Sequence, residues 1–551
     1  PEVWIERAVS CASTKLLAGM QRFKVVGVML SVVTLISLWA APSALAGEQP
    51  RRGGILQVAL AADPPSLDAH QEQTFAVAQP MGGIYNNLIV FDPHNYPEII
   101  GDLAKAWTVS DDHLAYTFTL HEGVKFHDGS QLTSADVKAS WDKIVLPPEG
   151  VISPRRSYYE VIKRIEAPDR SRVVFRLHHP SPAFLTNLAH PANFIYAKKY
   201  LDQDPHYYKS QTVGTGPFKL KNYVRGSYIE LERNPEYWKK GLPYLDGITY
   251  FIIKDTSARA KALRSGRVDA ELRYLPSAEA DAIKAQLGEK VVVAATGSIA
   301  NYGVTINVDK KPFDAERVRK ALSLALDRDD MAKTLGPIAL LDTVGGMMHP
   351  ASKWGLSEEE LQAFAGFGKD HAANLREAKR LLAEAGYPNG FKTVLTNRNI
   401  KTPYIDFAVY LISAWKKIGV EAEHKLEESA TWSQTRVARD FELLVDPYGS
   451  ATVGDPDELL VKFTTGGSNN WGRFSDSVLD ALFQQQAREM NEQKRIQLVK
   501  EMDKRILEKV WRIQCLWTNR LEVRSARIRN YQPQPSHWMN RRFEDVWLAE
   551  K

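Results

Sequence analysis

The sequence is poor in cysteine and carries no block of like charge. Only Cys11 and Cys515 occur among 551 residues, which excludes a disulfide framework. Lys and Arg number 71 and Asp and Glu number 66, so the net charge is only +5. The longest basic runs are pairs, such as Lys239 followed by Lys240. Because nucleic-acid-binding proteins concentrate basic residues on one face, we expect no nucleic-acid partner.

Motifs for catalysis, metals and cofactors are also missing. There is no GxxxxGK[ST] phosphate loop and no GxSxG nucleophile elbow. His121 and His127 are six residues apart on a predicted hairpin, whereas two zinc ligands on one helix face need i, i+4 spacing. Cys515 lies in the apolar stretch 513–517, which predicts a buried, inert thiol. We therefore expect no enzyme, no metal and no cofactor.

The N-terminal region has the pattern of a secretory signal peptide. Arg22 and Lys24 precede the uncharged apolar run 25–40, and Ala44-Leu45-Ala46 fits an A-x-A cleavage site. The apolar run of roughly 16 residues is shorter than the ~20 that a membrane-spanning helix needs. Gly47 stands where a lipoprotein requires a cysteine. We expect residues 1–46 to be an extension and signal peptide cleaved after Ala46, and the protein to be periplasmic and not lipidated.

The rest of the chain mixes strand and helix patterns. Apolar and polar residues alternate over 116–120, which predicts a half-buried strand. A helix is expected over 257–265, ending before Gly266. Another helix is predicted where Val318, Ala321, Leu322, Ala325 and Leu326 recur at i, i+3, i+4, i+7 and i+8. This mixture indicates an α/β or α+β protein with more than one sheet.

A series of motifs in a fixed order resembles one protein family over nearly all of residues 53–551. The motifs are 107–112 (WTVSDD), 116–129 (YTFTLHEGVKFHDG), 133–137 (TSADV), 214–218 (GTGPF), 233–238 (RNPEYW), 262–269 (ALRSGRVD), 318–322 (VRKAL), 381–387 (LLAEAGY) and 454–457 (GDPD). Together they resemble the extracytoplasmic solute-binding proteins of the peptide/nickel-type ABC importers, bacterial solute-binding family 5.

This resemblance implies the type II, two-lobe periplasmic binding protein fold of the large cluster, with mixed sheets flanked by helices and a hinge between the lobes. Lobe I would comprise 47–300, with an extra subdomain at about 90–210. Lobe II would comprise 301–519, and 520–551 would return to lobe I. Such a protein captures a solute, closes on it and delivers it to a membrane permease.

The resemblance implies a non-enzymatic, monomeric periplasmic receptor that binds a peptide or peptide-like solute and meets ABC permease subunits in the inner membrane. A second interpretation keeps the fold but changes the cargo to a nickel chelate, an opine, a sugar or another organic anion. A third interpretation, an exported hydrolase, would require a catalytic constellation that the sequence does not show.

Candidate ligand residues come from the resemblance and from aromatic residues in polar, turn-rich segments, which suit a solute cleft. They are Tyr85, Asn86, Arg155, Arg156, Trp432, Asp446, Tyr448, Thr452, Asp455 and Trp471.

Peptide-binding relatives hold the peptide amine with an Asp three residues before the Asp-Pro step, where this chain has Thr452. Either Asp446 or Asp455 replaces that anchor, or the ligand has no free amine there. With Arg155 and Arg156 toward the ligand, the sequence predicts an anionic or zwitterionic solute.

Overall fold

The computed structural model describes residues 48–296, 300–449, 454–536, 538–539 and 541–550. The expected signal peptide and Thr452 lie outside these ranges, so the predictions made for them stay predictions. Within the described part, no helix combines the length and the apolar character needed to cross a membrane. Residues 50–551 form one compact unit.

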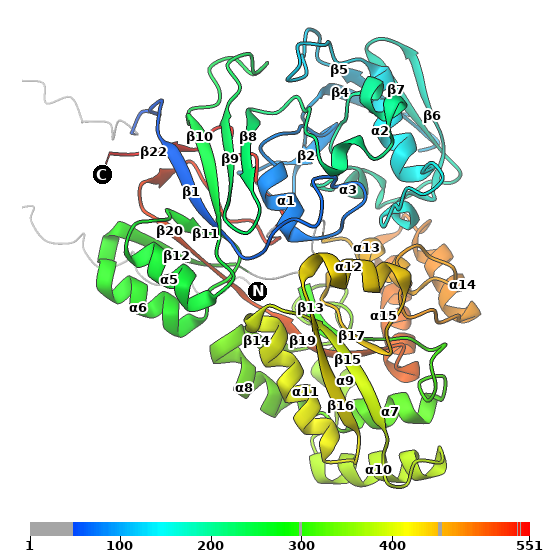
Figure 1. Ribbon diagram of the computed structural model, residues 1–551. Helices are drawn as coiled ribbons and strands as arrows, with labels where there is room; N and C mark the ends of the chain where they lie inside the picture. The colour runs from blue at the N-terminus through cyan, green and yellow to red at the C-terminus, as the bar shows by residue number, and fades with distance from the viewer. Residues whose placement is uncertain (1–47, 297–299, 450–453, 537, 540, 551) are drawn as a thin grey trace, which may run out of the picture. The chain divides into compact units, whose positions relative to one another are not determined.

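The first of two large sheets draws its strands from both ends of this unit (Figure 1). Its order is β12 (Val291–Thr296), β20 (Arg520–Ser525), β11 (Ala270–Glu271), β1 (Ile55–Leu60), β10 (Gly247–Ile252), β9 (Tyr228–Arg233) and β8 (Phe218–Val224). Strand β1 runs parallel to β10 and β11, and the other pairs are antiparallel. Helices α5 (Thr256–Arg264) and α6 (Ser277–Leu287) pack on it through Ala260, Leu263 and Ile283. The sheet is therefore mixed, and α5 confirms the helix expected over 257–265.

The second large sheet is built from the later part of the chain. Its order is β14 (Leu341–Val344), β19 (Arg512–Thr518), β13 (Ala300–Ile306), β17 (Leu443–Val445), β15 (Lys392–Arg398) and β16 (Glu421–Glu427), with β18 (Tyr448–Gly449) also paired to β13. The surrounding helices are α7 (Glu316–Leu324), α8 (Arg328–Ala339), α10 (His371–Glu384) and α11 (Asp406–Lys416). The five apolar residues predicted for one helix face are all fully buried, although α7 ends at Leu324.

A smaller antiparallel sheet has the order β4 (Ala104–Val109), β5 (Ala115–Leu120), β7 (Arg172–Leu177) and β6 (Ile162–Asp169). Strand β5 confirms the strand expected over 116–120. Helix α2 (Ser134–Val145) packs on this sheet, with Trp141 edge-on to Phe175. The Asp136 carboxylate accepts a hydrogen bond from the Thr133 amide at 2.8 Å, which is one half of a capping box.

Further strands and helices complete the described part of the chain. They are β2 (Ile89–Phe91), β3 (Ile99–Gly101), β21 (Ile528–Arg529), β22 (Trp547–Leu548), α1 (Phe75–Met81), α3 (Phe184–Leu188), α4 (Lys198–Gln203), α9 (Glu358–Leu361), α12 (Ser429–Ala438), α13 (Pro456–Leu460), α14 (Ser477–Gln486) and α15 (Glu492–Lys509). Single turns of 3-10 helix occur at η1 (Arg156–Tyr159), η2 (Tyr207–Lys209), η3 (Gly288–Lys290) and η5 (Val461–Phe463), and a π-helical turn at η4 (Lys401–Ile405).

Two large mixed sheets confirm the predicted α/β class. The first sheet takes strands from 55–296 and 520–525, and the second from 300–518. The chain passes from one sheet to the other before β13 and again between β19 and β20. The division into lobes with the stated boundaries, and the hinge between them, stays a prediction.

Candidate functional site

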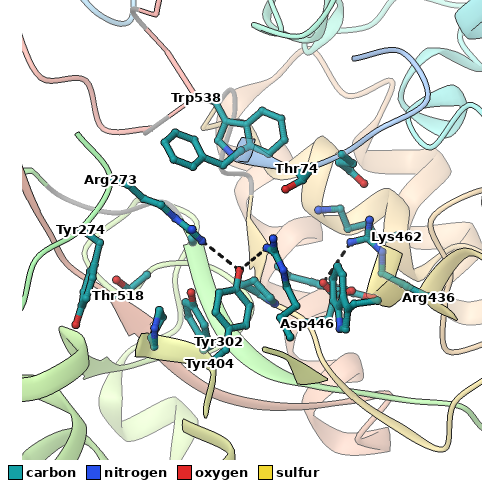
Figure 2. Close-up of a pocket in the computed structure, with 18 of the residues that line it drawn as sticks. Thr74, Arg273, Tyr274, Tyr302, Tyr404, Arg436, Asp446, Lys462, Thr518 and Trp538 are labelled. Carbon is teal, nitrogen blue, oxygen red and sulfur yellow. Dashed lines mark hydrogen bonds and ion pairs between the residues drawn. The ribbon is translucent and has the colours of Figure 1, made fainter. Parts of the chain in front are cut away.

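A cavity lies where residues of both large sheets and their connections come together. From the first sheet and its neighbours come Gln73, Thr74, Phe75, Arg273, Tyr274, Arg520 and Trp538; from the second come Ala300, Tyr302, Arg398, Pro403, Tyr404, Trp432, Arg436, Asp446, Pro447, Tyr448, Glu458, Lys462, Trp471 and Thr518. Aromatic and charged side chains dominate this lining, as Figure 2 shows. Such a mixture offers both contact area and fixed polar partners to a small solute.

Two arginines converge on one phenol inside the cavity. Arg273 follows β11, and its guanidinium donates to the Tyr404 hydroxyl at 3.3 Å. Arg398 ends β15 and donates to the same hydroxyl at 3.1 Å and to Ser429 at 2.6 Å. Figure 2 shows the Tyr404 hydroxyl receiving two such bonds. Within the described residues, neither arginine forms an ion pair with a carboxylate.

The phenol responds to this positive environment. Burial opposes ionisation of Tyr404, but the adjacent charges of Arg398 and Arg273 outweigh burial and lower the pKa of its hydroxyl. In contrast, burial and the neighbouring Tyr404 raise the pKa of Tyr302 well above its ordinary value. Both arginines donate to the Tyr404 hydroxyl, so their positive charge lies closest to this group.

A third arginine is held between two indoles. Arg436 of α12 lies 4.7 Å from the ring centroid of Trp432 and 5.2 Å from that of Trp471. Its Nη1 also reaches Oδ1 of Asp446 at 3.4 Å. Stacking on two aromatic faces fixes the plane of the guanidinium. Asp446 itself follows β17, and its carbonyl oxygen accepts a hydrogen bond from Arg512 at 2.5 Å.

The last cationic group of the lining is Lys462 in η5. Its Nζ lies 5.1 Å from the ring centroid of Tyr448, and the Arg512 guanidinium lies 3.8 Å from the same centroid. Burial lowers the pKa of Lys462 to about 8, although the nearby charge of Glu458 opposes this shift. Lys462 therefore keeps its charge at neutral pH.

Positive charge exceeds negative charge in the cavity. Arg520 has its own carboxylate partner, Glu522. The remaining cations are Arg273, Arg398, Arg436 and Lys462, and the lining carboxylates are Asp446 and Glu458. Four cations thus face two carboxylates, which makes the cavity attractive to an anion.

Four of the ten residues expected from the sequence line this cavity. They are Trp432, Asp446, Tyr448 and Trp471, all from the second sheet and its connections. Their side chains are almost fully buried. Thr452 lies outside the described residues. The structure therefore brings Trp432, Tyr448 and Trp471 together in one cavity, and Asp446 lines it whereas Asp455 does not.

The other five expected residues do not reach the cavity. Arg155 does not face a cleft, because it is fully buried and donates to the carbonyl oxygens of Ala69 at 2.8 Å and Ala192 at 3.1 Å. Arg156 is an exposed residue at the start of η1. Backbone carbonyl oxygens hold the Arg155 guanidinium in the interior, and neither Arg155 nor Arg156 is among the cationic groups that line the cavity.

Tyr85, Asn86 and Asp455 have structural partners as well. Tyr85 packs in an aromatic cluster, with Phe194 at 5.0 Å and Tyr196 at 5.1 Å between ring centroids. Asn86 donates to Asp102 at 2.9 Å. Asp455 caps α13 and pairs with Arg495 at 2.7 Å. Any role of these residues in ligand binding stays an untested prediction.

Sequence reasoning missed the arginines and the lysine of the cavity. Arg273, Arg398, Arg436 and Lys462 occur singly in ordinary surroundings, and 71 basic residues are spread along the chain. Only Arg436 carried a local signal, since it lies four residues after Trp432 on the same helix face. Among the described residues, no three His, Cys, Asp or Glu side chains gather as metal ligands.

The fold and the cavity define a binding protein with two mixed sheets around a positively charged site. The profile of the bacterial extracellular solute-binding proteins, family 5 (middle part), matches residues 98–471. This is more than half of the chain, and the chain belongs to that family. The expected family and its non-enzymatic, solute-binding character are thereby confirmed.

Curated relatives bind different solutes according to their names. The glutathione-binding protein GsiB of Pectobacterium atrosepticum is 32% identical over 338 residues, which are 60% of this chain and 60% of that protein. The heme-binding protein A of Haemophilus influenzae is 29% identical over 452 residues, or 76% of this chain and 78% of that protein. The match thus spans about three fifths of the glutathione-binding protein.

Solved structures confirm the predicted periplasmic binding protein fold. The binding protein AgaA of A. tumefaciens R10, in complex with agropinic acid, has a TM-score of 0.81 at 26% identity. It covers 90% of this chain and 99% of that chain. The protein DppA of Helicobacter pylori, in complex with the peptide STSA, has a TM-score of 0.78 at 25% identity and covers 91% and 99%.

Proposed function

We propose that this protein is the solute receptor of an ABC importer and that it captures a small, anionic, peptide-like solute in the cavity described above. The observation that carries this proposal is a pair of arginines, Arg273 and Arg398, that form no ion pair with any carboxylate in the part of the chain that the structure describes. They come from different sheets and meet at one phenol.

A buried guanidinium without a counter-charge is costly, because desolvation is not offset by an ion pair. Arg398 is 5% exposed, and among the described residues its side-chain acceptors are the hydroxyl oxygens of Tyr404 and Ser429 alone. A carboxylate from a solute would supply the missing charge through short, charge-assisted hydrogen bonds. The cavity therefore gains most from a ligand that brings negative charge.

The names of the relatives support the same chemistry. Glutathione, heme, a peptide with a free C-terminus and agropinic acid each carry at least one carboxylate. A non-peptide organic anion such as an opine remains a second candidate, favoured by the likeness to the agropinic acid complex. Both candidates would bring negative charge that balances the excess of cations in the cavity.

We further propose that the two sheets form the cores of two lobes, with boundaries at about 47–300, 301–519 and 520–551. Hydrogen bonds join them: Tyr274 donates to the carbonyl oxygen of Ile338 at 2.7 Å, and the hydroxyls of Ser157 and Ser468 lie 2.8 Å apart. A solute that contacts both Arg273 and Arg398 would favour this closed arrangement. The closed receptor, a monomer exported to the periplasm, would then meet the permease.

Calorimetry and native mass spectrometry of the purified protein test this proposal. The panel contains reduced and oxidised glutathione, the peptide STSA, agropinic acid and heme, with a C-terminally amidated STSA as the uncharged-terminus control. We expect binding of one or more carboxylate-bearing members and weakening of that binding in Arg273→Gln and Arg398→Gln. The exposed Arg317→Gln serves as a matched control.

The proposal fails if amidated and free forms bind equally and the two variants bind like the wild type. It also fails if no member of the panel binds and no small acidic solute co-purifies with the protein.

A further inference from the structure

The hydroxyl of Tyr404 is the meeting point of two guanidinium groups. Tyr404 lies in η4 and is 2% exposed, and the Asn397 side chain donates to its carbonyl oxygen at 2.8 Å, which holds the turn in place. Its hydroxyl oxygen accepts from Arg398 at 3.1 Å and from Arg273 at 3.3 Å (Figure 2). A guanidinium can only donate, so the phenol oxygen is the acceptor in both bonds. The oxygen therefore lies where an anion would be held.

The surroundings of this oxygen are positive on two sides. Arg273 follows β11 and Arg398 ends β15, and an arginine stays charged at neutral pH. The third ionisable neighbour is Tyr302 of β13, whose ring centroid lies 5.8 Å from that of Tyr404. Two permanent positive charges thus share one phenol as their common acceptor.

Other charged groups on the neighbouring elements have different partners or are exposed. The carboxylates are Glu271 of β11, which pairs with Arg259 at 2.6 Å, Asp406 of α11, which accepts from Thr402 at 2.6 Å, and two residues of α8, Asp329, which pairs with Lys369 at 3.0 Å, and Asp330, which accepts from Tyr410 at 2.7 Å. The lysines of η4, α8 and α11 are exposed, and they are Lys401, Lys333 and Lys416. The group already in place to carry a negative charge between the two guanidinium groups is thus Tyr404.

We propose that Tyr404 is the internal counter-anion of the solute-free cavity: its hydroxyl ionises between Arg273 and Arg398, and the carboxylate of a bound solute replaces it as their charge partner. In this exchange the phenolate oxygen gains one proton from solvent and becomes a hydroxyl again, while no other covalent bond forms or breaks. Burial raises the pKa of this hydroxyl, but Arg398 and Arg273 lower it by more, in agreement with the geometry. Burial and Tyr404 raise the pKa of Tyr302, which stays protonated beside it.

This inference rests on the proposed function, because it states which group the anionic solute replaces. One proton is taken up for each carboxylate bound whenever Tyr404 is ionised in the solute-free protein. Below the pKa of Tyr404, this group should not affect how the affinity depends on pH. As the pH rises through and above that pKa, the affinity for a carboxylate should fall by up to about tenfold per pH unit. Tyr404→Phe cannot ionise, so its affinity should lack this fall.

A pH titration of the protein, dialysed free of carboxylates, decides whether Tyr404 ionises. Tyrosinate has a distinct near-ultraviolet absorbance, and the difference between the wild type and Tyr404→Phe isolates one phenol. We expect tyrosinate in this difference below pH ~10, the ordinary pKa of tyrosine. Tyr228→Phe, which removes a half-buried tyrosine of β9 outside the cavity lining, is the matched control and should keep this tyrosinate.

Arg273→Gln removes one of the two positive charges and should shift the same ionisation to higher pH, which provides the test if Tyr404→Phe does not fold. Ionisation of Tyr404 only at or above pH ~10 would overturn the proposal. An ionisation that Arg273→Gln leaves in place would overturn it as well.

A second measurement tests the exchange itself. Acetate, the peptide STSA and agropinic acid are added to the wild type at a pH where Tyr404 is ionised, and calorimetry measures the binding of each. A carboxylate that binds should remove the tyrosinate absorbance of Tyr404, and its affinity should fall with pH in the wild type but not in Tyr404→Phe. Binding that leaves this absorbance unchanged would overturn the exchange and leave the proposed function intact. If Tyr404 ionises but no solute of the acidic panel binds, the exchange is overturned together with the proposed function.

Discussion

Arg398→Gln separates the binding role of a buried charge from its contribution to stability. Arg398 is 5% exposed, donates to two neutral hydroxyls, and leaves Nε without a partner. In the solute-free protein, the lost hydrogen bonds cost about 1–2 kcal/mol, while removal of an unpaired buried charge relieves a desolvation penalty of similar size. The free energy of unfolding should therefore change by less than about 1 kcal/mol.

Binding should respond much more strongly than stability. Loss of one partner of a buried charge pair costs about 2–5 kcal/mol, which corresponds to a decrease in affinity of at least about 30-fold. Urea unfolding followed by circular dichroism gives the stability, and calorimetry with the tightest acidic solute of the panel gives the affinity. The exposed Arg317→Gln should change neither quantity. A loss of stability above ~3 kcal/mol with unchanged affinity would show that Arg398 is a structural arginine.

Three further outcomes follow from buried groups away from the cavity. Lys143→Met should lower the free energy of unfolding by about 3–5 kcal/mol in urea titrations. In the wild type Lys143 lies 2.6 Å from the fully buried Asp68, and the substitution leaves this carboxylate without its counter-charge. A loss below ~1 kcal/mol would contradict this. Burial raises the pKa of Asp503 to about 7, so its contribution to stability is complete below pH ~4 and is lost as the pH rises through 7. The free energy of unfolding of the wild type, minus that of Asp503→Asn, should therefore fall between pH 4 and 8. A difference that does not change with pH would refute this. Burial also raises the pKa of Cys515 to about 11, so a thiol reagent should label it only after unfolding, and fast labelling of the native protein would be inconsistent with this burial.

Local patterns in the sequence were sufficient for many elements. The alternation over 116–120 became β5, and the apolar positions from Val318 onward are all buried around α7. Aromatic residues in polar sequence segments also pointed to Trp432, Tyr448 and Trp471, which all line the cavity, although Trp432 lies in α12 and Tyr448 in β18. These features depend on residues close together in the chain, and their physical cause is the fixed period of helices and strands.

The charges of the cavity could not be read in this way. Arg155 and Arg398 are chemically identical, yet Arg155 donates to the backbone carbonyl oxygens of Ala69 and Ala192 in the interior, whereas Arg398 donates to the Tyr404 hydroxyl in the lining of the cavity. Asp455 forms an ion pair with Arg495, whereas Oδ2 of Asp446 has no hydrogen-bond partner. Whether a charged side chain is satisfied depends on partners tens to hundreds of residues away. The sequence determined the local elements and the family, and only the tertiary structure decided which charges remain for a ligand, because pairing and desolvation are set by contacts in space.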